Sequence, residues 1–171
     1  MTALNRLFTA VCVYLGLGLA SGLAFREITK NADWPATDHT QLSVVHTHLL
    51  TLGVIVLLTV LALEVVLRLS ASRGLFTWFQ ITYHAGVLIS TGAMFARGLT
   101  TVLGVDLGGM DAGLAGIAGL GHMLLTAGFV LLMVMLRRAI VRRGEGASGQ
   151  DAAARSEAAR PADAEGAIAS R

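Results

Sequence analysis

Four histidines lie inside long apolar stretches of the sequence, and they are the residues most capable of chemistry: His46, His48, His84 and His122. An ionisable side chain at the centre of a membrane-spanning helix costs roughly 2.5–3.5 kcal/mol on insertion scales, so each of them needs a compensating partner. One such histidine is most simply a hydrogen-bonded contact between helices. Four of them, two in an H-x-H pair, favour a bound cofactor or metal ion.

The H-x-H pair cannot hold one ion by itself. His46 and His48 are two residues apart, which places them about 200° apart around a helix, so they serve different neighbouring sites. Counted inward from the outer helix ends at 1.5 Å per residue, they lie roughly 6 and 9 Å deep, and His122 lies roughly 13 Å deep. His84 enters from the opposite side and is expected near mid-membrane. The four imidazoles are therefore predicted to cluster in the outer and middle parts of the bundle.

Haem fits these ligands better than zinc does. Zinc sites usually take three or four protein ligands, and no acidic residue is expected at the depth of the histidines. Haem needs one or two axial histidines in an apolar pocket, and the absence of a CxxCH sequence makes it haem b. Its anionic propionates would seek cations at the outer interface, where Arg26 and Arg97 are expected. The same arginines could instead extend to lipid headgroups or pair with Glu27.

The elements that carry these residues are apolar helices. The chain has 171 residues, of which 54% are hydrophobic and 14% charged, with mean hydropathy +0.68. Charges gather in short clusters between stretches of about 20 apolar residues, the length that crosses a bilayer. We predict an all-α integral membrane four-helix bundle over residues 1–143, with spans at 7–25, 42–67, 75–103 and 113–136. Trp78 and Tyr83 are expected as aromatic-belt residues at the inner interface.

Charge sets the predicted topology. Basic residues near the first and last spans and between the second and third place both termini in the cytoplasm of a plasma-membrane protein. The same pattern explains the basic pI without a nucleic-acid partner. Residues 144–171 contain no aromatic residue and one isoleucine, so they are predicted to form a disordered cytoplasmic tail.

Two resemblances follow from the second span. The stretch 41–53, QLSVVHTHLLTLG, preceded by FREITK at 25–30, resembles an uncharacterised family of small four-pass bacterial membrane proteins. The H-x-H-x4-G pattern also resembles the helix of haem–copper oxidase catalytic subunits in which two histidines hold two haems. That superfamily has twelve spans in three four-helix repeats. The resemblance implies a homo-oligomer, most simply a trimer, with His48 of one copy towards His46 or His84 of the next.

The copper-site histidines of that superfamily have no counterpart here, so oxygen reduction is not expected, and the sequence contains no enzyme motif. The leading expectation is a b-type haem protein that acts in electron transfer or in haem or gas sensing, with a redox partner that the sequence does not identify. One alternative is a site for copper or a similar ion bound by the four imidazoles. Another needs no cofactor, and makes the chain an assembly partner or a proton pathway.

Overall fold

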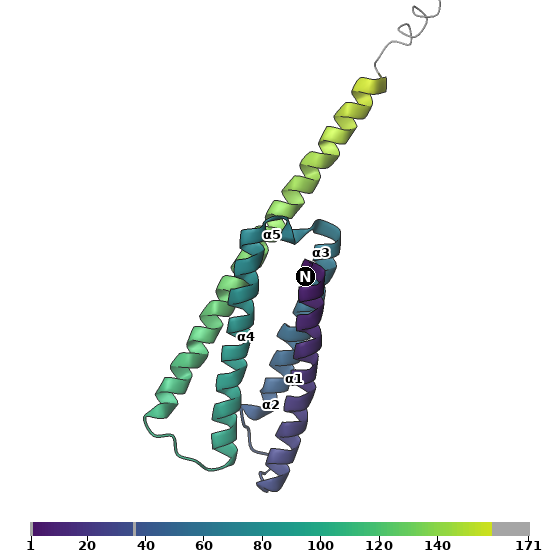
Figure 1. Cartoon of the computed structure of the whole chain (residues 1–171). Coiled ribbons are helices and arrows are strands. Elements are labelled where there is room, and N and C mark those ends of the chain that lie inside the picture. The colour runs from purple at the N-terminus through teal and green to yellow at the C-terminus, as the bar shows by residue number, and fades with distance from the viewer. Residues whose placement is uncertain (1, 36, 159–171) are drawn as a thin grey trace, which may run out of the picture.

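The computed structural model describes residues 2–35 and 37–158, and over these ranges the chain is helical, without a strand. It contains four helices long and apolar enough to cross a membrane, which confirms the all-α membrane bundle (Figure 1). The elements are α1 (Ala3–Asn31), the second span made of α2 (Leu42–His48), η1 (Leu49–Val56) and α3 (Leu57–Leu67), a short turn η2 (Leu69–Ala71), α4 (Arg73–Val102) and α5 (Met110–Ala158).

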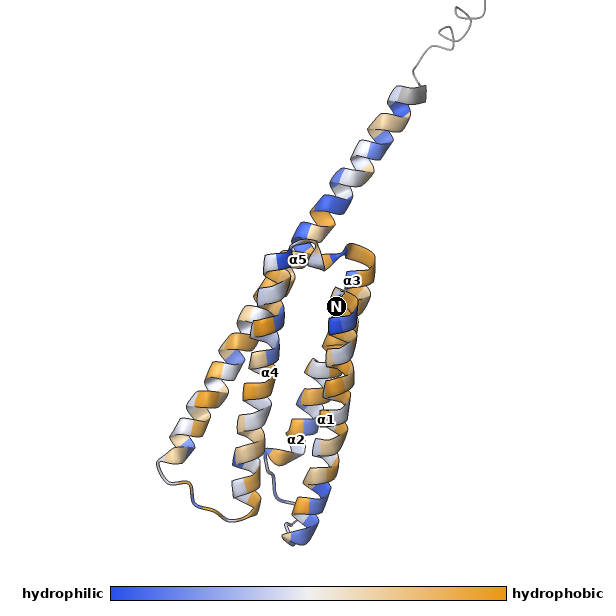
Figure 2. Ribbon diagram, in the orientation of Figure 1, coloured by the Kyte–Doolittle hydropathy of each residue, from blue (hydrophilic) through white to orange (hydrophobic). Residues whose placement is uncertain are grey.

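The last helix is longer than the sequence suggests. It continues to Ala158, past the bundle and away from it (Figure 1), whereas the tail from residue 144 was expected to be disordered. Residues 144–158 contain five alanines, the residue with the highest helix propensity, and they extend a helix that is already nucleated. Figure 2 shows this extension as mostly hydrophilic. The rest of the expected tail, residues 159–171, lies outside the described residues.

The middle of the second span is a π-helix, η1 (Leu49–Val56). Such segments are rare and frequently occur at functional sites. Two tyrosines contact it. Tyr83 donates its hydroxyl hydrogen to the carbonyl of Leu52, at 2.9 Å, and the ring of Tyr14 packs against Gly53 so closely that a Cβ there would lie 2.5 Å from the Cβ of Tyr14. Gly53 therefore allows α1 to approach the π-helical turn.

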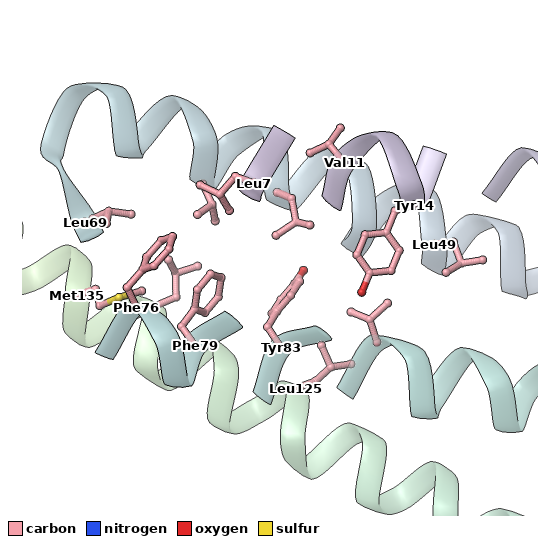
Figure 3. Close-up of a cluster of buried hydrophobic side chains, with 14 of the residues drawn as sticks. Leu7, Val11, Tyr14, Leu49, Leu69, Phe76, Phe79, Tyr83, Leu125 and Met135 are labelled. Atoms are coloured by element: carbon pink, nitrogen blue, oxygen red, sulfur yellow. The ribbon is translucent and has the colours of Figure 1, made fainter. Parts of the chain in front are cut away.

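Helix α4 is the central helix of the bundle. In its most apolar window 39% of the residues are buried, against 22% for α1 and for α5. Glycines bring α5 close to it, since a Cβ on Gly86 would lie 2.6 Å from the backbone nitrogen of Leu125. Close approach of small residues is the usual way that helices pack in a bilayer. The buried core runs along α4 from Phe76 through Phe79 to Tyr83 (Figure 3).

Candidate functional site

The best-connected polar side chains inside the bundle are Tyr14, His84 and Gln80, which we call the Tyr14–His84–Gln80 chain. The hydroxyl of Tyr14 lies 3.0 Å from Nδ1 of His84, and Nε2 of His84 lies 2.7 Å from Oε1 of Gln80. An amide oxygen only accepts, so Nε2 carries the hydrogen and Nδ1 accepts from Tyr14. The Tyr14 and His84 rings also stack, with centroids 5.6 Å apart. Both ring nitrogens of His84 are therefore in use.

Sequence reasoning missed two members of this chain. Tyr14 was given no role, although it falls on the buried stripe of α1 with Leu7, Val11 and Gly18, a signal that helical periodicity offers. Gln80 lies one helical turn before His84 on α4, and this i−4 spacing is a second signal. The expectation for Tyr83 is wrong: its side chain is 0% exposed and bonds to the π-helix, so it belongs to the core rather than to an interfacial belt. Figure 3 shows its hydroxyl directed towards the other helices.

His46 faces α1. Its Cβ and Cγ lie against Gly22, where a Cβ would be 3.7 Å from that of His46. The Nδ1 atom of His46 is buried and has no hydrogen-bond partner among the described residues, and its Nε2 is 3.4 Å from the hydroxyl oxygen of Thr47. A buried, unpaired ring nitrogen is costly. His46 is thus a polar group that lacks a partner on the α1 side of the second span.

His48 and His122 share one arrangement. Nδ1 of His48 lies 3.0 Å from the carbonyl oxygen of Val44, and Nδ1 of His122 lies 2.8 Å from that of Ala118. Since a carbonyl only accepts, Nδ1 carries the hydrogen in both rings, and the lone pair is on Nε2. No described residue hydrogen-bonds to either Nε2. Histidines that ligate metals usually hold their second nitrogen in this way, which fixes the tautomer and orientation of the ring.

The four histidines do not form one cluster. Within residues 2–35 and 37–158, no group of three or more histidine, cysteine, aspartate or glutamate side chains is placed to hold a metal ion. His84 is engaged in its own chain of hydrogen bonds, and His46 faces α1. His122 is exposed on α5. Helix rise fixes the depth of each histidine in the bundle. Whether the histidines face one another depends on how the helices are arranged, which helix rise does not give.

The two arginines proposed to meet an anionic group are paired with acids. Nη2 of Arg97 lies 2.7 Å from a carboxylate oxygen of Asp111 at the outer end of α4. Arg26 lies 3.7 Å from Glu27, and both side chains are more than half exposed, so the pairing left open in the sequence is the one present. Arg97 lies near the C-terminal end of α4, beside the loop that leads into α5.

An apolar cavity of about 380 Å³, wide open to the surface on one side, lies between α1, the second span and α4. Its walls include Leu17, Ser21, Leu49, Leu88 and Phe95. Leu17 is three residues beyond Tyr14 and Leu88 four beyond His84, so the cavity begins one helical turn above the Tyr14–His84 hydrogen bond. Such a size falls within the range of small-molecule sites, roughly 300–1,000 Å³.

One comparison with known proteins gives a match. The sequence model of a family described as "protein of unknown function (DUF2871)" matches residues 4–139, which include all four spans. No curated protein and no solved structure matches the chain. The comparisons therefore show no similarity to haem–copper oxidases, and the family itself carries no assigned activity.

Proposed function

Because the chain belongs to the DUF2871 family, whose function is unknown, and has four apolar spans, we propose a function from its intramembrane histidines. The protein binds b-type haem within the membrane and acts in electron transfer or in haem or gas sensing. No step of a chemical reaction is assigned to it.

One observation carries this proposal: the ring of His48. Its Nδ1–H is held by the carbonyl of Val44 at 3.0 Å, which leaves the Nε2 lone pair directed away from its own helix. A neutral imidazole in this tautomer is the form that binds haem iron. The position of His48 in an apolar span supplies the low-polarity environment that a haem requires.

Haem also accounts for the number of available ligands. A metal ion without a porphyrin usually needs three or four protein ligands, and no group of three is present in the described part of the chain. Haem iron already has four porphyrin nitrogens, so one or two histidines complete it. A copper-like site remains the alternative, and it would need ligands from more than one chain.

The mode of action depends on the ligand count. Two axial histidines close the iron coordination and leave electron transfer as the function, because no position is open to a gas. A single axial histidine leaves the sixth position free for a gas or for an incoming ligand. Arg97 lies near the outer helix ends, and its guanidinium is suited to bind a haem propionate while it keeps its ion pair with Asp111.

The experiment is a reduced-minus-oxidised visible spectrum of the full chain purified in mild detergent, before and after haem supplementation. We expect a Soret band that decreases in the His48→Gln variant. The His39→Gln variant is the matched control, because His39 lies in the exposed loop before α2. A wild-type protein that stays colourless after supplementation contradicts the proposal, and stoichiometric metal in that colourless protein would support the copper-like alternative.

A second function is favoured by a different observation. The Tyr14–His84–Gln80 chain connects α1 and α4 by consecutive hydrogen bonds inside the bundle, and the amide nitrogen of Gln80 is buried without a partner. A tyrosine hydroxyl and a histidine ring can relay protons in membrane proteins, whereas the amide of Gln80 passes no proton on and instead orients the ring of His84. We expect proton flux into proteoliposomes to fall in Tyr14→Phe and to persist in Tyr83→Phe. Equal flux in wild type and Tyr14→Phe rules this function out.

A further inference from the structure

We propose that His48 and His122 of one chain are the two axial ligands of a single haem, which is held between α2 and α5 on the side of the bundle away from α1. This inference rests on the proposed haem function and deepens it, since it names the ligand pair. His84 and His46 are excluded from the pair.

His48 and His122 share a tautomer that leaves Nε2 available as a ligand. His48 and His122 are the two intramembrane histidines whose Nδ1–H is held by the carbonyl four residues earlier, at 3.0 and 2.8 Å. Each therefore presents an unpaired Nε2 lone pair to its surroundings. His84 cannot do so, because its nitrogens are bound to Tyr14 and Gln80.

Contacts between the helices fix the depths of His48 and His122 in the bundle, and the two depths are similar. Leu42 of α2 lies opposite Gly98 of α4, and Gly121 of α5 lies opposite Ser90 of α4. His48 is six residues inward from Leu42, at the level of residue 92 of α4, and His122 is one residue inward from Gly121, at the level of residue 89. Three residues of rise separate these levels, about 5 Å. His84 is eight residues below the level of His48, about 12 Å.

His48 and His122 also lie on the adjoining sides of α2 and α5. Around α4, the residue that faces α5 (Ser90) and the one that faces α2 (Gly98) are about 80° apart, so α2 and α5 are neighbours across one side of α4. On α2, His46 faces α1 and His48 lies about 200° away, on the side of α5. On α5, Gly121 faces α4 and His122 is about 100° further round, a turn that carries it towards α2.

A buried serine of α4 lies at a similar level to the two histidines. Ser90 of α4 is 1% exposed, and its hydroxyl has no hydrogen-bond partner among the described residues. It packs against Gly121, where a Cβ would lie 2.7 Å from the backbone nitrogen of Ser90. Its level on α4 falls between those of His48 and His122. The hydroxyl oxygen of Ser90 also faces Gly121 and would meet a Cβ there, so Ser90 belongs to the close contact between α4 and α5.

Coordination by the pair follows from these positions. Each imidazole would hold haem iron through its Nε2, and the two Nδ1–H groups on backbone carbonyls keep both rings from rotating. The iron is then six-coordinate, and the haem acts as an electron carrier.

The test uses the full-length protein in mild detergent, loaded with haem, with the axial ligands read from electron paramagnetic resonance and near-infrared magnetic circular dichroism. We expect a bis-histidine signal in wild type. His48→Gln and His122→Gln should each lose it, become five-coordinate and bind haem at least tenfold more weakly. His46→Gln is the matched control, and it should retain the bis-histidine signal.

Imidazole added to His48→Gln or His122→Gln should restore a six-coordinate spectrum, which a misfolded variant would not do. A bis-histidine signal that survives in His122→Gln overturns the pair while leaving the proposed haem function intact. A wild-type protein that takes up no haem overturns the haem function itself, which is a different result.

A mixing experiment tests the placement in one chain. His48→Gln and His122→Gln chains with different tags are produced together, and assemblies that carry both tags are isolated. A pair within one chain gives no bis-histidine signal in these assemblies, because every chain lacks one ligand. Recovery of the signal in the mixed assemblies would show that the pair joins two chains and would overturn the placement.

Discussion

The hydroxyl of Tyr14 and Nδ1 of His84 lie 3.0 Å apart and join α1 to α4, two helices that otherwise have few contacts. Most of the packing of α1 is with the second span. The Tyr14–His84 hydrogen bond is thus a direct polar connection between α1 and the central helix α4.

Replacing Tyr14 with phenylalanine should destabilise the protein by about 1–3 kcal/mol, because it leaves the buried Nδ1 acceptor of His84 without a donor. Unfolding in a denaturing detergent, followed by helical circular dichroism, measures the change. The double variant Tyr14→Phe/His84→Phe should lose less stability than the sum of the losses in the two single variants, since the two partners act together. Additive costs would show that the bond contributes nothing.

Gly53 should tolerate no side chain. A Cβ there would meet both the Cβ of Tyr14, at 2.5 Å, and its Cδ1, at 2.7 Å. We expect Gly53→Ala to cost about 1–3 kcal/mol through overpacking. Gly116 is the matched control, because a Cβ there has nothing within 4 Å, and Gly116→Ala should be neutral or slightly stabilising, by less than about 1 kcal/mol. The same unfolding measurement applies, and equal values for both variants would contradict this packing.

The four spans could be predicted because length and apolar character are properties of each segment by itself. The predicted span 42–67 coincides with the second span of the structure, and α4 begins two residues before its prediction. What the pattern did not contain is the π-helix at Leu49–Val56. A change from four- to five-residue hydrogen bonding needs no distinctive residue, and here it accompanies contacts from Tyr14 and Tyr83.

The site was predictable only in part, for a related reason. The opposite faces of His46 and His48 follow from helix geometry alone. The partners of His84 do not, because Tyr14 is 70 residues away in sequence and only the helix arrangement brings it near. The carbonyl bonds of His48 and His122 are local and could have been expected from the i−4 position of Val44 and Ala118 in a helix.

The ion pair of Arg97 with Asp111 should contribute little to stability. The two side chains are 36% and 46% exposed, and exposed pairs contribute about 0–1 kcal/mol. A double-mutant cycle with Arg97→Gln and Asp111→Asn should therefore give a coupling below about 1 kcal/mol, and salt should weaken it further. In the haem-loaded protein, Arg97→Gln should lower haem affinity more than Asp111→Asn does. The reverse order would remove Arg97 from the propionate site.

The long α5 helix should end in the cytoplasm, on the same side as the N-terminus. Arginines at positions 137, 138, 142 and 143 follow the last apolar stretch, and basic residues beside a span stay on the cytoplasmic side. Cys12 is the single cysteine, so Cys12→Ser gives a background for labelling. In that background a membrane-impermeant maleimide added to intact cells should label Thr37→Cys, in the loop between α1 and α2, and leave Ser148→Cys unlabelled. Ser148→Cys should react only after the membrane is opened, and labelling of Ser148→Cys in intact cells would reverse the topology.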